Sequence, residues 1–317
     1  MRWNSGRASF SIDVTILLCA LILPYLTSDF SLFQVSQVMV MAIAILGLTL
    51  LVDISGQFSL GHGAFFAFGA YVAAILMEQS GVPCYLALVI AGAASFALGL
   101  LLGIPALRLD GVYLAIATFV VGAATPTILK LSVLDSVTGG VQGIYLSKPD
   151  VPFGLHLSQD QWLYYIVLFC SAALYIVSLN ILGSRSGRAL MAIKQNAVAS
   201  SALGINVPYY KILIFGISAA FAGIAGAINA ILVQFVAPEA FTIHLSISLV
   251  VGLVLGSLAG LRGALLGAAF IVIVPNWTEH ISKGLSGVVF GLILIALTCA
   301  MPTLRRLIAR ARPIHSQ

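Results

Sequence analysis

Long runs of apolar residues, separated by short polar stretches, constrain this sequence more strongly than any other feature. Residues 42–52 and 212–233, for example, contain no charged side chain. Apolar runs of about 18 residues or more have the length needed to cross the hydrocarbon core of a bilayer. Only 8% of the residues are charged, whereas a water-soluble domain carries about 25%. The sequence therefore predicts an integral membrane protein whose main solvent is the lipid bilayer.

The same runs indicate which secondary structure crosses the membrane. In lipid, every backbone donor and acceptor must be paired within the protein, which leaves a helix bundle or a closed β-barrel. Barrel strands alternate apolar and polar residues over about ten positions, and residues 42–52 and 212–233 do not alternate. We therefore expect an all-α fold, a polytopic integral membrane helix bundle in which residues 1–317 form a single transmembrane domain.

About ten transmembrane helices are expected from the apolar runs, over residues 11–28, 34–52, 61–78, 84–104, 112–131, 162–182, 209–233, 244–260, 263–279 and 285–302. Lys and Arg concentrate in cytoplasmic loops, so their distribution tests this count. With a cytoplasmic N-terminus, the outer segments hold only Lys130, Lys148 and Lys283 of the 15 basic residues. This distribution predicts that both termini are cytoplasmic.

Two connections are long enough to have a role of their own. The outer, periplasmic one, residues 132–161, is rich in turn residues such as Gly139 and Gly140, which predicts an irregular segment. In the inner one, residues 183–210, Ser186 can cap a helix and Gly204 can close it. The apolar side of this cytoplasmic helix would consist of Ala189, Leu190, Ile193, Ala197 and Leu203.

Catalytic chemistry finds little support in the sequence. There is no intramembrane pair of carboxylates, no HExxH motif and no Cys/His spacing typical of a metal site. The GxxxxGK[ST] loop that cradles nucleotide phosphates is also absent. We therefore expect no catalytic residue, no metal and no cofactor on this chain. The formal charge of +5 is explained by membrane topology, and no nucleic-acid partner is expected.

Three polar side chains lie between the end of the second predicted span and the first turn of the third, namely Gln57, Ser59 and His62. Polar residues at membrane depth usually face the interior of the bundle or a water-filled cavity. His62 is therefore either a hydrogen-bonded structural residue near the inner membrane edge or part of the wall of a transport route. The sequence leaves both interpretations open.

Small residues recur inside several predicted spans, for example Gly216, Gly223 and Gly226 in 209–233. Lipid tails give helices no hydrophobic reason to associate, so small residues that let two backbones approach are a main route to tight packing. The pattern predicts a compact bundle or an interface with a partner.

Several motifs resemble one family. They are Gly56 to Tyr71 (GQFSLGHGAFFAFGAY), Leu107 to Thr118 (LRLDGVYLAIAT), Thr138 to Ile144 (TGGVQGI), Ser186 to Asn196 (SGRALMAIKQN), Ala202 to Val207 (ALGINV) and Tyr210-Lys211. Their order and sequence are similar to those of LivM-type permeases of branched-chain amino acid ABC importers. The resemblance covers most of the chain from about residue 51 to residue 267.

The resemblance implies a division of labour in the inner membrane of a bacterium. A periplasmic binding protein would deliver branched-chain or related small amino acids to this chain, which would pair with a second, homologous permease subunit. Two cytoplasmic ATP-binding subunits would hold ATP and Mg and drive transport. The multi-pass chain itself would be a non-catalytic subunit.

The resemblance also assigns roles to particular residues. The inner helix, about residues 187–203, would be the coupling helix that docks on one ATPase, through Arg188, Ala189, Asn196, Ala199, Leu203 and Gly204. Gln57, Ser59, His62 and Thr118 would line the translocation path. A different interpretation of the inner helix is a membrane-surface helix that binds anionic lipid through Arg185, Arg188 and Lys194.

Three other functions remain open at this point. Related permeases of the same family serve urea or short amides. A self-sufficient channel or secondary transporter is less favoured, because the centres of the predicted helices lack the ionisable groups that mark coupling-ion routes. A membrane scaffold without transport activity would tolerate loss of the inner loop.

Overall fold

In a computed structural model, the described residues are 7–109, 111–149, 151, 157–257, 260–281 and 291. Seven of their helices are long and apolar enough to cross a membrane. These helices are α2 (Asp29–Thr49), α3 (His62–Ser80), α4 (Cys84–Ala106), α5 (Val112–Leu129), α7 (Gln159–Gly183), α10 (Val207–Val233) and α12 (Gly263–Ile281). The protein is a polytopic helical membrane protein.

These seven helices match seven of the ten predicted spans. The other three predicted spans do not match any of these seven helices. The first prediction, 11–28, is wrong in its bounds, because α1 covers Arg7–Ile22 and a 3-10 turn follows at Leu23–Tyr25. The span predicted over 244–260 is too long. Helix α11 covers Ile243–Gly256, and its 14 residues reach about 21 Å at 1.5 Å per residue, short of a bilayer core of about 30 Å. The last prediction, 285–302, lies outside the described residues apart from Gly291.

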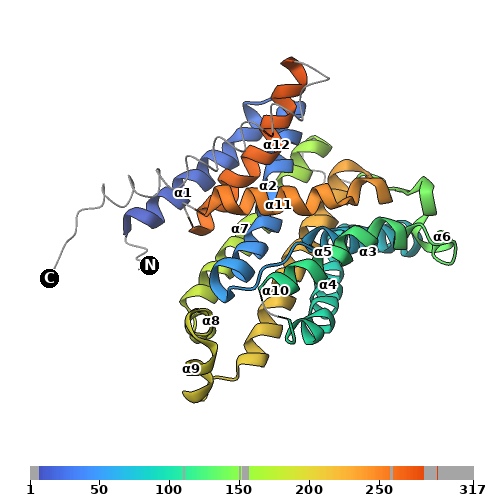
Figure 1. The fold of residues 1–317 in the computed structure, drawn as a ribbon. Coiled ribbons are helices and arrows are strands. Elements are labelled where there is room, and N and C mark those ends of the chain that lie inside the picture. The colour runs from blue at the N-terminus through green and yellow to red at the C-terminus, as the bar shows by residue number, and fades with distance from the viewer. Residues whose placement is uncertain are drawn as a thin grey trace.

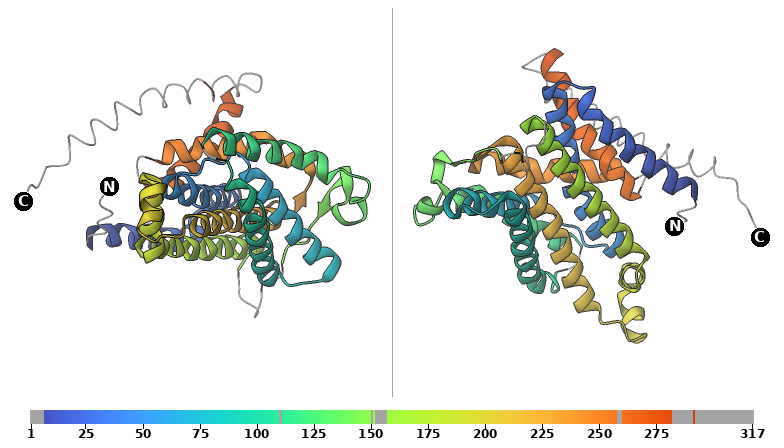
Figure 2. Two further views of the ribbon diagram at one scale, coloured as in Figure 1. Left: turned by 60° about the horizontal axis from the view of Figure 1, so that its bottom comes forward. Right: turned by 180° about the vertical axis from the view of Figure 1, so that it is seen from behind.

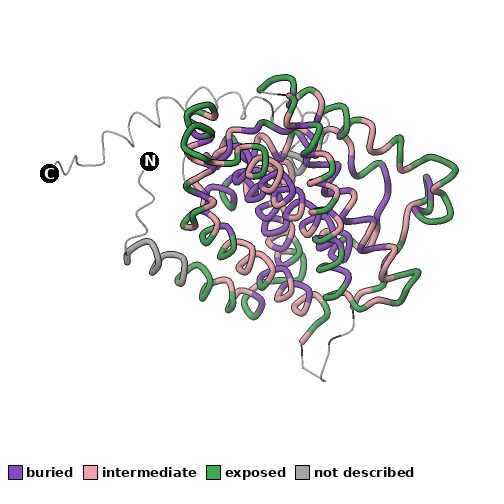
Figure 3. The backbone as a smooth tube through the Cα atoms, turned by 90° about the horizontal axis from the view of Figure 1, so that it is seen from below, coloured by how far each residue is buried: buried purple, intermediate pink, exposed green. Residues whose placement is uncertain are grey.

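Helices α2 and α10 (Figure 1) form the centre of the bundle, and Figure 3 shows the buried residues gathered in its interior. Helix α10 packs against α2, α3 and α4, and α2 packs in addition against α7, α11 and α12. In the most apolar stretch of residues 29–54, which contain α2, 83% of the residues are buried. In the corresponding stretch of α5 only 17% are buried. Helix α5 therefore presents most of its surface to lipid or to another subunit.

Glycines at the crossing of α3 and α10 explain how closely these two helices pack. A Cβ added at Gly226 would fall on the carbonyl oxygen of Phe66, and one at Gly69 would fall on the carbonyl oxygen of Gly223. Only residues without a side chain allow such backbone contact. The small residues predicted to tighten the bundle therefore do so inside this chain.

The connection between α5 and α7 is more regular than predicted. It contains α6 (Asp135–Thr138), a 3-10 turn (Gly140–Gln142) and strand β1 (Ile144–Tyr145). Strand β1 pairs antiparallel with β2 (Phe235–Val236), which follows α10, in the register Ile144↔Val236 and Tyr145↔Phe235. The predicted irregular segment thus contains short regular elements, and sequence alone could not show the strand because its pairing partner comes from a distant part of the chain.

The two long connections, predicted to be outer and inner, lie at different ends of the molecule. In Figure 1, α6 lies at the right edge, and α8 (Arg185–Gln195) and α9 (Ala197–Ala202) lie at the lower end. Near α6, Lys130 forms an ion pair of 2.7 Å with Glu239, which belongs to the 3-10 turn Pro238–Phe241. The hydrogen bond from Lys130 lowers the pKa of the Glu239 carboxyl. Figure 2 shows α8 and α9 projecting beyond the membrane helices.

Candidate functional site

The connection between α2 and α3 interrupts the helical path. Helix α2 widens into a π-helical turn, Leu50–Ile54, before it ends, and α3 begins only at His62. The turn is closed by hydrogen bonds from the Gly56 amide to the Val52 carbonyl, 3.1 Å, and from the Ser55 hydroxyl to the Leu51 carbonyl, 2.6 Å. Gly56 has φ +76°, a left-handed conformation that glycine adopts without strain. Non-helical backbone at membrane depth occurs where protein or a cavity surrounds it.

Hydroxyl oxygens of neighbouring helices accept hydrogen bonds from backbone amides at the start of α3. The first amides of any helix lack an intrahelical acceptor. Here the Leu60 amide donates to Thr118 Oγ1 of α5, and the Gly63 amide donates to Ser246 Oγ of α11, each at 3.0 Å. Thr118 and Ser246 therefore hold the interrupted backbone in place from two sides.

The glycines on either side of His62 make this approach possible. A Cβ added at Gly61 would fall on the carbonyl oxygen of Thr118, and a Cβ at Gly63 would collide with Ser246 Oγ. The Gly-His-Gly motif is thus explained by the close passage of α5 and α11 past the start of α3.

His62 lies in a chain of buried hydrogen bonds. The Ser218 hydroxyl donates to the Gly47 carbonyl at 2.7 Å, so Ser218 Oγ accepts from His62 Nε2–H at 2.6 Å. The other ring nitrogen, Nδ1, then accepts from the Ser59 hydroxyl at 3.1 Å. In its neutral form the imidazole therefore carries its hydrogen on Nε2, and the side chain joins α3 to α2 through α10.

The four residues predicted to line a path are all buried in this chain. The exposed fractions are 8% for Gln57, 2% for Ser59, 1% for His62 and 9% for Thr118. Gln57 Nε2 donates to the Lys211 carbonyl at 3.2 Å, while Thr118 borders a mainly apolar cavity of about 110 Å³ between α3, α4, α5 and α10. The structure brings the four side chains to one interruption of the helical path, and their transport role remains a prediction.

Sequence reasoning missed Ser218 and Ser246. Both are hydroxyls inside otherwise apolar runs, and such residues usually hydrogen-bond within the bundle. That signal was available, but it does not say which helix supplies the partner.

Replacing Ser218 with alanine is expected to destabilise the protein by about 1–3 kcal/mol, because His62 Nε2–H would lose its acceptor inside the bundle. The measurement is the thermal unfolding transition of the purified protein in detergent. Ser95→Ala is the matched control, since Ser95 Oγ is buried without a hydrogen-bond partner in the described part of the chain. The control should be neutral or stabilising, and an unchanged transition for Ser218→Ala would contradict the network.

The inner connection consists of two helices, so the prediction of one helix over 187–203 is wrong. Helix α8 is capped by Ser184, whose hydroxyl accepts from the Gly187 amide at 3.1 Å, and the predicted cap Ser186 instead lines a cavity. Asn196 adopts an extended conformation, φ −157° and ψ 104°, and caps α9 by accepting from the Ala199 amide at 3.0 Å. The predicted closing residue Gly204 has φ +83°, as its role requires.

The residues predicted to contact an ATPase differ in their surroundings. Arg188, Asn196, Ala199, Leu203 and Gly204 are exposed, and Ala189 is half-buried. Arg188 Nη1 donates to the Gly183 carbonyl at 3.1 Å, so this guanidinium group caps the end of α7. Leu203 is 82% exposed and therefore does not belong to the buried apolar side of the loop, which Leu190 and Ile193 form.

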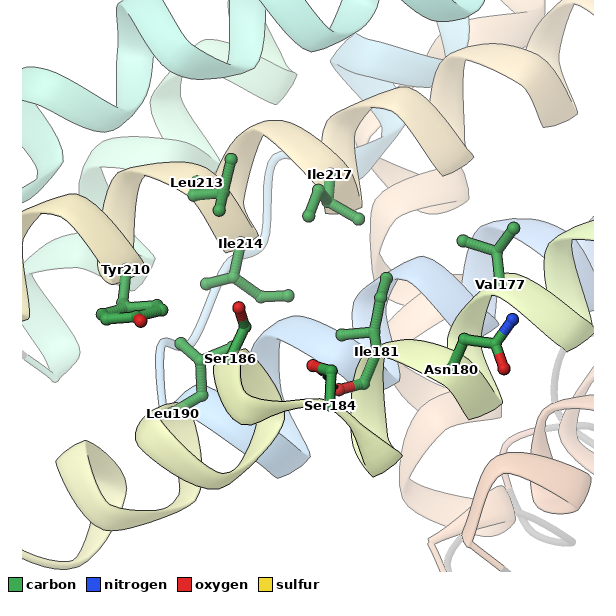
Figure 4. Close-up of a pocket in the computed structure, with 10 residues that line it drawn as sticks. All are labelled: Val177, Asn180, Ile181, Ser184, Ser186, Leu190, Tyr210, Leu213, Ile214 and Ile217. Carbon is green, nitrogen blue, oxygen red and sulfur yellow. Dashed lines mark hydrogen bonds between the residues drawn. The ribbon is translucent and has the colours of Figure 1, made fainter.

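A cavity of about 320 Å³ lies where α8 turns away from the membrane helices. Figure 4 shows Val177 and Ile181 of α7 facing Ile214 and Ile217 of α10, with Ser186 between the helices. The lining is mainly apolar. The turn from α7 into α8 therefore leaves room between the inner ends of α7 and α10.

The fold and this site define a class of protein. The apolar spanning helices place the chain among the polytopic helical membrane proteins, and interrupted helices inside such bundles occur in many transporters. No three His, Cys, Asp or Glu side chains gather in a way that could hold a metal ion within the described ranges.

The chain belongs to the family described as the permease component of the branched-chain amino acid transport system, whose sequence model matches residues 31–298. It is 34% identical over 255 residues to the high-affinity branched-chain amino acid transport system permease proteins LivM of Salmonella typhimurium and Escherichia coli. Each alignment covers 72% of this chain and 59% of the relative, so the chain spans less than two thirds of their length.

A more distant relative is the probable branched-chain amino acid transport permease protein LivM of Methanocaldococcus jannaschii. It is 27% identical over 158 residues, which cover 50% of this chain and 45% of the relative. No solved structure matches the chain. The chain is thus a multi-pass membrane transport protein of the permease family.

Proposed function

We propose that this chain is a membrane-spanning subunit of an ATP-driven ABC importer in the bacterial inner membrane. Its substrates are branched-chain or related small amino acids. The observation that carries the proposal is the α8–α9 loop in a chain of the permease family. Val198 and Leu203 are 80% and 82% exposed on this loop, and exposed apolar side chains outside the membrane are typical of docking surfaces.

The importer contains further subunits. A periplasmic binding protein captures the substrate, a second homologous permease completes the membrane part, and two cytoplasmic ATP-binding subunits supply the energy. ATP and Mg bind to those subunits, because this sequence lacks a GxxxxGK[ST] loop. This chain has no catalytic role and binds no cofactor, and both of its termini are cytoplasmic.

The translocation path passes beside the α2–α3 connection. Gln57, Ser59, His62 and Thr118 surround an interrupted helix near the predicted inner membrane edge, and interrupted helices are where many transporters bind or release substrate. Weakly polar hydroxyl and amide groups suit a zwitterionic amino acid that must leave quickly after the binding protein has provided the affinity.

Uptake in cells tests the proposal. Labelled leucine is supplied to cells that lack this chain and to cells that express it again, with unlabelled valine, alanine or urea as competitors. We expect uptake to return with the chain, to be displaced by valine, and to disappear when ATP is depleted. Displacement by urea alone would instead indicate a permease for urea or short amides, and uptake that survives ATP depletion would indicate a channel or secondary transporter.

A further inference from the structure

The end of α2 is bound by a side chain from the α8–α9 loop. The ammonium group of Lys194, in the last turn of α8, lies 2.6 Å from the carbonyl oxygen of Asp53 and 3.5 Å from that of Val52. The Val52 carbonyl also accepts from the Gly56 amide, so the main contact of Lys194 is the shorter one, with the Asp53 carbonyl, at the end of the helix where intrahelical donors run out. A cation at this end is favourable, because the helix dipole is negative there.

The aliphatic part of Lys194 makes a second contact. A Cβ added at Gly56 would lie 3.2 Å from Lys194 Cγ, so the lysine stem crosses directly over the backbone that leads from α2 to α3. Lys194 therefore contacts this connection through its stem and through its charge.

The beginning of α10 contacts the same connection. Gln57 Nε2 donates to the carbonyl oxygen of Lys211, which lies in the first turns of α10, just after the loop. The α2–α3 connection thus contacts both α8 and α10. Two residues after Gln57 comes Ser59, the hydroxyl that donates to His62.

We propose that Lys194 is a positioning residue through which the α8–α9 loop sets the conformation of the α2–α3 connection. The proposal rests on the proposed function, since it adds to it the route by which movement of the docking loop reaches the polar interruption of the bundle. Coupling between distant sites is carried by packed and hydrogen-bonded contacts that both sites bias. A charge-assisted hydrogen bond with a packed stem is such a contact.

Two variants separate the charge from the stem. Lys194→Met keeps a long apolar stem and removes the ammonium group, whereas Lys194→Arg keeps a cation with hydrogen-bond donors. Each is compared with the wild type as a purified chain in lipid nanodiscs, and again in the complete transporter reconstituted in proteoliposomes. The nanodisc preparation tests whether the contact stabilises the α2–α3 connection, and the proteoliposomes test whether the contact couples ATP hydrolysis to transport.

Hydrogen exchange in nanodiscs measures the contact. We expect Lys194→Met to raise the exchange of amides 55–61 by about tenfold, the effect of losing one hydrogen bond to a charged group. The arginine variant should exchange like the wild type, and amides at the crossing of α3 and α10 should not change. If amides 55–61 of the Lys194→Met variant exchange at the wild-type rate, the proposal is overturned.

Transport in proteoliposomes measures the coupling. We expect Lys194→Met to retain its ATPase subunits and to hydrolyse ATP, while the amino acid taken up per ATP falls at least tenfold and recovers in Lys194→Arg. Normal uptake per ATP in Lys194→Met would overturn the proposal even if exchange rises. A wild-type complex without ATP-driven uptake would overturn the proposed function and, with it, the coupling role. This result is distinguishable from a failure of the coupling role alone, because it appears in the wild type and needs no substitution.

Discussion

Replacing Leu203 with glutamate is expected to abolish ATP-driven uptake while the membrane bundle remains folded. Leu203 is 82% exposed at the end of α9, and it precedes Gly204, whose φ of +83° turns the chain back toward α10. If this apolar side chain fills a groove of an ATPase subunit, burying it contributes about 1.5–3 kcal/mol. A buried unpaired carboxylate costs still more.

The affinity of the permease for its ATPase subunits should therefore fall by a factor of about 10 to 100 or more. The measurements are co-purification of the ATPase subunits and uptake by intact cells. Leu203→Met is the matched control, because it keeps an apolar side chain of similar volume, and it should retain uptake. Normal uptake by Leu203→Glu would show that α9 does not dock through this residue and would favour a loop that lies on the lipid surface.

Gly226→Val is expected to prevent stable folding of the bundle. The new Cβ would coincide with the carbonyl oxygen of Phe66, and backbone atoms on both helices cannot move aside as the tip of a side chain can. Helix α10 would have to separate from α3 along the crossing that also contains Gly69 and Gly223. The cost of overpacking a tight interface is about 1–3 kcal/mol and rises when backbone must shift, so we expect about 3 kcal/mol or more.

The amount of protein in the membrane and its unfolding transition in detergent measure this effect. Gly183→Ala is the control, since no atom lies within 4 Å of its added Cβ. The control should accumulate and unfold like the wild type. A Gly226→Val variant with wild-type stability would mean that α3 and α10 do not cross at these glycines.

The spanning helices could largely be predicted from the sequence, because the bilayer acts on every segment alone. An uninterrupted apolar run must form a helix wherever it lies in the bundle, and the helix predicted over 84–104 is found at Cys84–Ala106. The same local rule failed for α11, since this helix ends at Gly256 although the apolar run in the sequence continues. Hydropathy indicates whether a residue prefers lipid or water, and it does not indicate where the helix that contains the residue ends.

The inner loop shows where local signals stop being sufficient. Both Ser184 and Ser186 can cap a helix, and the choice depends on Gly187. A side chain at Gly187 would collide with the Ile181 and Leu182 carbonyls, so α8 can start close to the end of α7 only with glycine there. The break at Asn196 is likewise set by its extended backbone and its cap of α9.

By itself, the sequence determined that this chain is an integral membrane protein, that its membrane-spanning segments are helices, and that its motifs resemble those of a permease. Only the tertiary structure decided which groups meet. It joined His62 to Ser218, separated by 156 residues, and Lys194 to Asp53, separated by 141 residues. Periodicity and capping act within a few residues, whereas the partners of a buried hydroxyl or ammonium group are chosen by how the helices pack.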